Sequence, residues 1–347
     1  MKALVISLNF NPGHVSHMVA SCKQCEELGY ECAYYANPAF KAFLPEESVV
    51  YTSEAERPLV DLAIFLFPSQ KNLSAICRMK REGAKVVYIF HEPLARMKLY
   101  RQAGFSWKYL AKLSVIDRVN ALTVKWSDVI LLPSRKAVDY YEANRHYRNK
   151  RYHYMPLMYS DERLERHIDM PRRYFSYIGT VAADHSFREY LDFIEWAIMN
   201  DRLEGISILI ATKSDFDIPE VIAQSERVTV RKGVPLSDEE INDCYASSVA
   251  VWNAYARTTQ SGVLAKAFMF GTPALVMRCN LNEFTRDNDN VVAIDDNSDP
   301  LLIENAVMKI SDNFNEFSSN CRRQFESSFY YGVYNEEIKS IIEGRAE

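Results

Sequence analysis

The 347-residue sequence lacks several features that mark special classes of protein. No uninterrupted apolar run approaches about 18 residues, so no membrane-spanning helix is expected. The apolar stretch in MKALVISLNF is too short for a secretory signal, and no cleavage-like region follows it. There is no internal repeat and no low-complexity segment. The seven cysteines are irregularly spaced, which indicates reduced thiols in a cytoplasmic protein.

Length and composition indicate an ordinary globular protein with two domains. Apolar residues make up 48% of the chain and charged residues 25%, and the length exceeds what one hydrophobic core usually organises. The net charge of −5 is unevenly distributed: residues 1–170 contain 24 Lys/Arg and 18 Asp/Glu, whereas residues 171–347 contain 17 and 28. This asymmetry suggests that the two halves bind different partners.

Short apolar runs alternate with helical stretches in both halves. The runs that predict buried strands are Ala3–Leu8, Glu31–Tyr35, Ala63–Phe67, Val86–Phe90, Val129–Leu132, Tyr174–Ile178, Ile206–Ile210, Val228–Val230, Val249–Trp252 and Ala274–Met277. Such alternation predicts parallel sheets with helices on both faces. We therefore predict an α/β fold of two doubly wound Rossmann-like domains that face each other across a cleft. The first spans residues 1–165 and the second 170–329, and a C-terminal helix over about 330–347 packs back on the first.

Ordered motifs along the chain carry a family resemblance. They are a loop with Gly13, Leu28-Gly29-Tyr30-Glu31, Phe90-His91-Glu92-Pro93, Ser127–Ser134 (SDVILLPS), Tyr177-Ile178-Gly179-Thr180, Arg231-Lys232-Gly233-Val234, Ala246–Trp252 (ASSVAVW) and Ala267–Pro273 (AFMFGTP). In this order the sequence resembles retaining glycosyltransferases of group 4 (glycosyl transferases group 1), which have the GT-B fold. The resemblance covers essentially the whole chain. It implies transfer of a sugar from a UDP- or GDP-sugar to a glycan or lipid-linked acceptor, with retention, in cell-surface polysaccharide or glycoconjugate assembly.

Residues 256–275, ARTTQSGVLAKAFMFGTPAL, correspond to the family's donor-binding segment but contain no Asp or Glu. We call them the donor segment. The family has one Glu in this loop and another eight residues later, which contact the sugar and ribose hydroxyls. Aligned on Gly271-Thr272-Pro273, these positions are Thr258 and Lys266. We then expect the donor to be held by hydroxyl, amide and backbone groups of Thr258, Thr259, Gln260, Ser261 and Gly262. The alternative is that this segment is an ordinary capped helix.

The diphosphate of a nucleotide sugar gains charge as the bond breaks, so it needs helix N-termini, backbone N–H groups and cations. The family's Arg and Lys after the glycine of the second domain's first strand correspond here to Thr180 and His185, which follow Gly179. Basic side chains that could substitute are Arg188, Lys213 and Arg257, and the alternative for each is a solvated surface charge. The resemblance also implies that Val234 offers backbone atoms to the base.

In the first domain, His91 and Glu92 directly follow the strand VVYIF and are the candidate catalytic residues. The resemblance places the histidine beside the reacting sugar, and an imidazole can transfer a proton near neutral pH. The alternative is a structural loop histidine. Gly13 allows close approach of the first loop to the donor phosphate. The resemblance implies no protein nucleophile, and we expect neither a tightly bound cofactor nor a required metal ion.

Residues 96–118 carry six basic side chains, several aromatic ones and only one acid, Asp117. A basic amphipathic stretch of this kind is typical of a surface that contacts anionic lipid, here at the inner face of the cell membrane. The alternative is a packed helix with a solvated basic face. A nucleic-acid partner is not expected, because neither an RNA-binding signature nor a strongly basic domain is present.

The transferase hypothesis has two alternatives. One is a nucleotide-sugar epimerase of related fold, which usually needs acid/base pairs that the sequence does not reveal. The other is a catalytically weakened relative that acts as a scaffold in glycan assembly, which the loss of both Glu residues favours.

Overall fold

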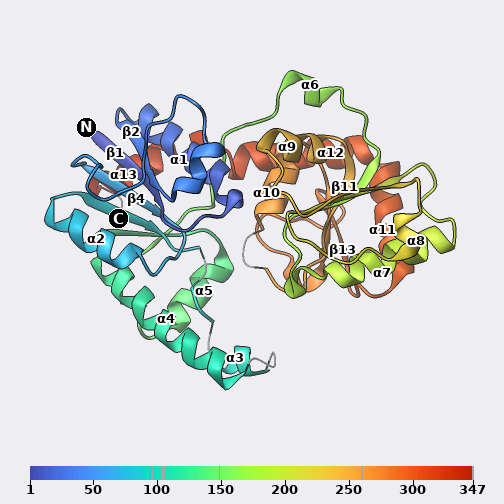
Figure 1. Ribbon diagram of the computed structural model, residues 1–347, viewed down its shortest axis with the longest axis horizontal. Coiled ribbons are helices and arrows are strands. Elements are labelled where there is room, and N and C mark those ends of the chain that lie inside the picture. The colour runs from blue at the N-terminus through green and yellow to red at the C-terminus, as the bar shows by residue number, and fades with distance from the viewer. Residues whose placement is uncertain (92, 96, 103–105, 148, 259–260, 346–347) are drawn as a thin grey trace. The chain divides into compact units, whose positions relative to one another are not determined.

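The computed structural model describes residues 1–91, 93–95, 97–102, 106–147, 149–258 and 261–345, and Figure 1 shows their course. The chain divides into two compact units: unit 1 comprises Met1–Ser160 and Tyr330–Glu347, and unit 2 comprises Asp161–Phe329. Each unit is built on one sheet whose paired strands run parallel in the described residues. The prediction of two parallel-sheet α/β domains is confirmed.

The described part of unit 1 contains a seven-stranded sheet in the order β3-β2-β1-β4-β5-β6-β7. Its strands are β1 (Lys2–Ser7), β2 (Glu31–Ala36), β3 (Val50–Tyr51), β4 (Leu62–Leu66), β5 (Lys85–Ile89), β6 (Val129–Leu132) and β7 (His153–Tyr154). Its helices are α1 (Val15–Glu27), α2 (Asn72–Arg81), α3 (Met97–Gln102), α4 (Trp107–Trp126), α5 (Arg135–Ala143) and α13 (Asn335–Glu343), with 3-10 turns η1 (Pro12–His14), η2 (Pro38–Ala42) and η5 (Tyr331–Tyr334). The central strands are apolar throughout because both faces of the sheet are covered: all five residues of β4 are buried.

The described part of unit 2 contains a six-stranded sheet in the order β10-β9-β8-β11-β12-β13. Its strands are β8 (Tyr174–Ile178), β9 (Ser207–Ala211), β10 (Val228–Arg231), β11 (Ser248–Asn253), β12 (Ala274–Met277) and β13 (Val291–Ile294). Its helices are α6 (Glu165–Ile168), α7 (Phe187–Met199), α8 (Glu220–Ala223), α9 (Asp238–Ala246), α10 (Gly262–Met269), α11 (Pro300–Asp312) and α12 (Phe314–Ser328), with turns η3 (Ala183–His185) and η4 (Arg278–Asn280). A large aromatic core fills the α7 side of the sheet, where Trp252 is completely buried.

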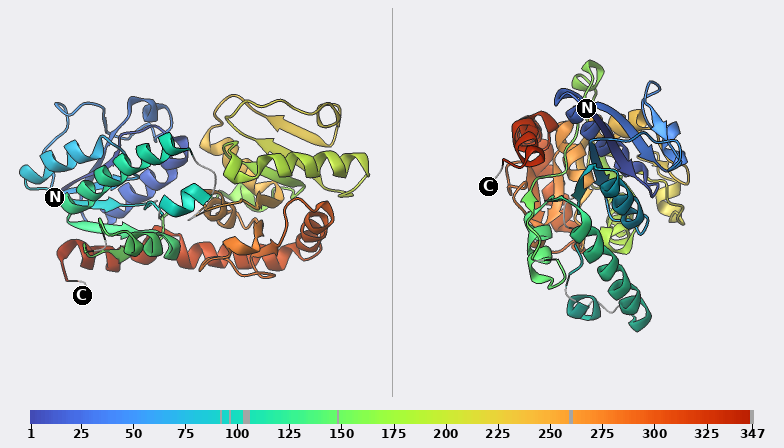
Figure 2. Two further views of the ribbon diagram at one scale, coloured as in Figure 1. Left: turned by 90° about the horizontal axis from the view of Figure 1, so that it is seen from below. Right: turned by 90° about the vertical axis from the view of Figure 1, so that its left-hand side faces the viewer.

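The chain returns to unit 1 after α12, and α13 lies against that unit in Figure 2, where it is drawn in red. Gln24 on α1 donates from Nε2 to the carbonyl of Tyr331 and to Asn335 Oδ1, both at 3.2 Å. The Tyr331 hydroxyl donates to Glu27 at 2.5 Å. These bonds fix the C-terminal segment on α1.

None of the helices in the described ranges is both long enough and apolar enough to cross a membrane. Strands β3, β7 and β13 are additions to the sequence prediction. The first two are only two residues long, which is too short to give a periodic signal.

Candidate functional site

The strand order of unit 2 places a candidate ligand site between β8 and β11. β9 and β10 lie on one side of β8, and the chain then crosses to the other side of β8, where β11, β12 and β13 follow. In such sheets, ligands bind beyond the carboxyl ends of the strands where the order reverses. β8 ends at Ile178 and is followed by Gly179, whose φ is 139°. A Cβ on Gly179 would lie 3.7 Å from Val263 in the first turn of α10. The end of β8 therefore adjoins the start of α10.

Helix α10 begins at this point with a regular cap. Ser261 has extended backbone, and its Oγ accepts the Leu264 N–H at 3.4 Å. Asn253, the last residue of β11, donates from Nδ2 to the same Oγ at 2.8 Å. The first turn of α10 contains no acidic residue. Because the first turn has no carboxylate, it does not neutralise the positive end of the helix dipole. Such a helix N-terminus favours binding of an anion.

Backbone bonds join the loop after β8 to the start of the donor segment. The Asp184 carbonyl accepts the N–H groups of Ala256 at 2.9 Å and Arg257 at 3.4 Å. The His185 ring stacks on Tyr255 with centroids 4.3 Å apart and an interplanar angle of 9°. Its Nδ1 lies 2.8 Å from the carbonyl of Thr180. We call this assembly the switch-point site: it comprises residues 179–185, residues 253–258 and the first turn of α10 with its N-cap Ser261.

Tyr255 and Asn253 are functional candidates that the sequence analysis missed. Tyr255 is 3% exposed, burial raises the pKa of its hydroxyl, and the hydroxyl has no hydrogen-bond partner among the described residues. Asn253 is also buried. Their position at the carboxyl end of the central strand VAVW is a signal that could have identified them.

The predicted cations differ in their surroundings. Lys213 is exposed and lies two residues after the end of β9. The next residue, Ser214, contacts the loop after β8, since its Oγ accepts the Val181 N–H at 3.1 Å. Arg257 is exposed in the donor segment itself. The side chain of Arg188 is 89% exposed and is 3.8 Å from Asp192 on α7, so the structure does not draw it into the site. Val234 is 69% exposed beyond the end of β10.

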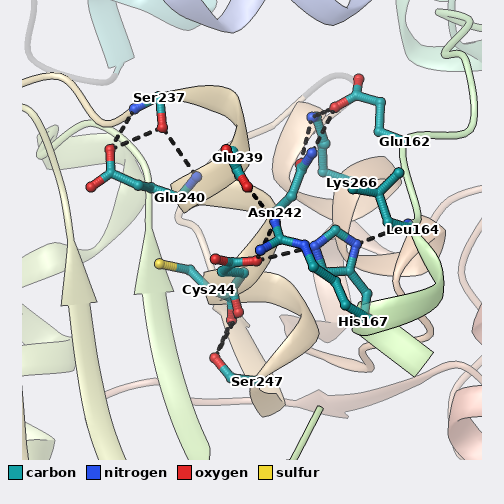
Figure 3. A network of polar contacts seen from close by, with 12 residues as sticks. Glu162, Leu164, His167, Ser237, Glu239, Glu240, Asn242, Cys244, Ser247 and Lys266 are labelled. Carbon is teal, nitrogen blue, oxygen red and sulfur yellow. Dashed lines mark hydrogen bonds and ion pairs between the residues drawn. The ribbon is translucent and has the colours of Figure 1, made fainter. Parts of the chain in front are cut away.

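Lys266 is 8% exposed and lies in a polar cluster that Figure 3 shows. Its Nζ is 2.5 Å from Glu162 Oε2 and 2.9 Å from Asn242 Oδ1. Asn242 on α9 also donates to Glu162 at 3.0 Å. A buried ammonium needs such partners. The Lys266 side chain thus ties α10 to α9 and to the segment that opens unit 2.

The Gly-Thr-Pro sequence that follows α10 has a structural explanation. Gly271 has φ 65°, and a Cβ on it would lie 2.6 Å from Ser318 Oγ. The hydroxyl of Thr272 donates to the Tyr245 carbonyl and accepts from Arg172, each at 2.7 Å. Burial lowers the pKa of Arg172 to about 10. These contacts fix the C-terminal end of α10.

In unit 1, residues at the ends of β1, β4 and β5 gather around Phe67. This residue follows β4 with φ 62°, an uncommon conformation for a bulky side chain. His14 stacks on its ring at a centroid distance of 3.6 Å, and the His91 ring lies 5.4 Å away. Gly13 is exposed in η1, and its N–H bonds Asn11 Oδ1 at 3.2 Å. The structure thus brings Gly13 and His91 to the same edge of the sheet.

Several predicted residues cannot be placed in this way. Glu92, Thr259 and Gln260 lie outside the described residues. Thr258 and Ser261 border the gap at 259–260, and Gly262 is the first residue of α10. Within the described ranges, no group of three His, Cys, Asp or Glu side chains could hold a metal ion. The spacing Asp-x-Asp occurs at Asp215–Asp217, where Asp215 pairs with Lys232 at 2.8 Å, and at Asp287–Asp289, where Asp287 pairs with Arg278 at 2.8 Å. The expectation that no metal is required therefore stays a prediction.

Comparison with known proteins identifies the fold. No protein-family model and no curated protein sequence matches the chain. Among solved structures, the chain is similar to HepE from Anabaena in complex with UDP and glucose, with 13% identity, a TM-score of 0.70, and coverage of 99% of this chain and 100% of that one. It is also similar to sucrose-phosphate synthase from Thermosynechococcus elongatus, with 10% identity, a TM-score of 0.66 and 99% of both chains covered.

A third similar structure is a putative UDP-N-acetylglucosamine 2-epimerase from Listeria monocytogenes, with 12% identity, a TM-score of 0.62, and coverage of 100% of this chain and 98% of that one. At these identities the likeness concerns the fold alone. The chain thus has the two-domain, Rossmann-like fold of GT-B glycosyltransferases.

Proposed function

We propose that this protein is a glycosyltransferase that moves a sugar from a nucleotide sugar to a glycan or lipid-linked acceptor. The observation that carries the proposal is the switch-point site of unit 2. There Asp184 in the loop after β8 accepts hydrogen bonds from Ala256 and Arg257 of the donor segment. Asn253 at the end of β11 donates to Ser261, the N-cap residue of α10. Solved structures of the same fold hold UDP or UDP-glucose.

The chemistry of the site suits a departing nucleoside diphosphate. The first turn of α10 offers a positive helix end, and Lys213 and Arg257 are exposed cations at the carboxyl edge of the sheet. Groups of this kind stabilise the charge that grows on the leaving group. Hydroxyls of Thr258 and Ser261, together with Thr259 and Gln260, take the place of the family's carboxylates toward the sugar. As the family resemblance implies, the proposed reaction with retention uses no protein nucleophile.

Unit 1 supplies the acceptor side of the proposed reaction. His91 lies at the end of β5 among the ring systems that surround Phe67, and Gly13 lies in the first loop. In this proposal His91 orients the acceptor hydroxyl or handles its proton, as an imidazole does near neutral pH. Glu92 follows it in the sequence and is proposed to assist.

We further propose that the protein binds an anionic membrane surface through α4 and α3 and reaches its acceptor there. These two helices lie together at the edge of unit 1 (Figure 1). Large apolar side chains on α4 are exposed: Trp107 (70%), Val115 (61%), Leu122 (45%) and Trp126 (46%). The exposed cations beside them are Lys108, Lys112, Arg118 and Lys125. We call these eight side chains the α4 surface. Exposed aromatic and basic side chains on one helix match the boundary of an anionic bilayer.

The one acid of α4 is turned away from this surface. Asp117 is 5% exposed and accepts hydrogen bonds from Asn144 at 2.8 Å and from the Tyr147 hydroxyl at 2.7 Å. His146 Nδ1 lies 2.6 Å from its other oxygen. The α4 surface therefore carries only positive charge, which supports placement at the inner face of the cell membrane.

A thermal-shift screen with UDP, GDP and their sugars tests the proposal. A transferase is expected to be stabilised by one of these nucleotides and to consume its sugar donor only when an acceptor is present. Absence of any shift at millimolar nucleotide would refute the proposal.

The likeness to a putative 2-epimerase favours epimerisation as the second candidate. An epimerase converts the nucleotide sugar without an acceptor, so product analysis of the donor alone separates the two activities. A scaffold protein would leave every donor unchanged with every acceptor tried.

A further inference from the structure

We propose that His185 is a proton-dependent ligand of the donor diphosphate, so that the switch-point site binds nucleotides more tightly when this imidazole is protonated. The inference rests on the proposed function, because it assigns a regulation to the same site. It concerns a position where the resemblance would have placed a permanent cation and where this chain has an imidazole instead.

The geometry fixes which nitrogen of His185 can gain a proton. Its Nδ1 lies 2.8 Å from the carbonyl oxygen of Thr180. A carbonyl only accepts hydrogen bonds, so Nδ1 carries the hydrogen and Nε2 is the basic nitrogen. Among the described residues, Nε2 has no hydrogen-bond partner. The side chain is half-buried, so this nitrogen can meet a ligand.

Two contacts hold the ring in this orientation, and a third fixes the backbone of His185. The ring stacks on Tyr255 at an interplanar angle of 9°. The Trp252 indole donates from Nε1 to the His185 carbonyl at 3.2 Å, and the Thr180 bond prevents rotation about the ring axis. An imidazole held this way loses little conformational entropy when it binds an anion, so its charge contributes fully to affinity.

The loop that carries this imidazole is hydrogen-bonded to the donor segment, which also contains α10. The preceding residue, Asp184, accepts two backbone N–H groups of the donor segment through its carbonyl. The other end of the same loop, Gly179, adjoins Val263 in the first turn of α10. A diphosphate at the start of α10 is therefore close to the loop that carries His185.

The other charged or titratable side chains on the elements around His185 are not imidazoles. On its own loop and on α7 these are Asp184, Arg188 and Glu189. The others are Lys213 after β9, Tyr177 on β8, Tyr255 just before the donor segment and Arg257 within it. Asp, Glu, Lys, Arg and Tyr side chains titrate outside the interval from about pH 6 to 8. Burial further raises the pKa of Tyr177 and of Tyr255.

The direction of the pH effect follows from linkage. A bound diphosphate stabilises the protonated imidazole, so binding takes up a proton and becomes weaker as the pH rises. Each pH unit above the imidazole's titration lowers the affinity by up to about tenfold. Nucleotide affinity should therefore be lower at pH 8.0 than at pH 6.5.

The test measures the dissociation constant of UDP or GDP, whichever stabilises the protein in the screen, by calorimetry at pH 6.5, 7.2 and 8.0. Wild-type protein is compared with His185→Gln, His185→Lys and a control, His153→Gln, which removes a histidine of β7 in unit 1. His185→Gln should bind weakly with little pH dependence, His185→Lys tightly at every pH, and the control like wild type. Comparison between variants cancels the titration of the nucleotide's own terminal phosphate.

Equal pH dependence in wild type and His185→Gln overturns the inference, provided that circular dichroism shows both to be folded. If His185→Gln is unfolded, His185→Lys decides: unchanged pH dependence in that variant contradicts the proposal. Failure of the wild type to bind any nucleotide at every pH is a different result, because it contradicts the proposed function itself.

Discussion

Removal of the Glu162 carboxylate is predicted to destabilise unit 2, because it removes the ion-pair partner of the buried Lys266 ammonium and leaves only the weaker interaction with Asp238. Lys266 is 8% exposed, and its Nζ lies 2.5 Å from Glu162 and 2.9 Å from Asn242 Oδ1. Breaking a buried ion pair by deleting one partner costs about 3–5 kcal/mol. Since Asn242 remains as an acceptor and the Glu162 side chain is 19% exposed, Glu162→Ala should lower the free energy of unfolding by about 3 kcal/mol.

Denaturant titration followed by tryptophan fluorescence measures this change. The chain has four tryptophans. Replacing Trp107 and Trp126 of unit 1 by Phe restricts the emission to Trp196 and Trp252 of unit 2, so that the transition reports the unit in which the ion pair lies.

Two matched variants show whether the loss arises from the unpaired charge. The double variant Glu162→Ala/Lys266→Met removes both charges and should recover most of the stability, because an apolar pair of similar size tolerates burial. Arg188→Ala breaks an exposed pair on α7 and should leave the transition unchanged. A Glu162→Ala transition within about 1 kcal/mol of wild type would refute the reasoning and leave Lys266 free to act as a donor ligand.

Three other variants test the remaining assignments. Lys213→Ala should reduce the nucleotide-induced rise in melting temperature by half or more while leaving the unliganded protein unchanged; an unaltered rise contradicts its assignment to the diphosphate. Gly271→Ala should destabilise unit 2 by about 2 kcal/mol or more, because φ is 65° and the new Cβ would lie 2.6 Å from Ser318 Oγ; calorimetric unfolding measures this. Charge reversal of Lys108 and Lys112 should abolish co-sedimentation with phosphatidylserine-containing vesicles, and retention on neutral vesicles by the same variant would argue against an electrostatic α4 surface.

Much of the fold could be predicted because its strands are buried on both faces. A continuous apolar run such as Ala63–Phe67 is required when helices cover both sides of a sheet, and the observed β4 (Leu62–Leu66) differs from it by one residue at each end. Strand β13 was not predicted, although Val291–Ile294 is apolar and is flanked by Asn and Asp residues.

The candidate site could be predicted only where it adjoins a strand. Gly179, Lys213 and the donor segment follow strand ends, and in a parallel sheet all strand ends of one direction meet at the same edge. The stack of His185 on Tyr255 had no sequence signal, because these residues are 70 positions apart and their contact depends on two loops packing together.

The sequence by itself determined the two parallel sheets, because alternating apolar runs and amphipathic helices leave few other ways to bury their surface. It also determined that the donor segment has no carboxylate of its own. Only the tertiary structure decided how the charges pair. Lys266 meets Glu162 across 104 positions of sequence, and Asp117 is buried in unit 1. A buried charge must find a partner wherever the fold brings one within reach, and that partner is set by packing in three dimensions.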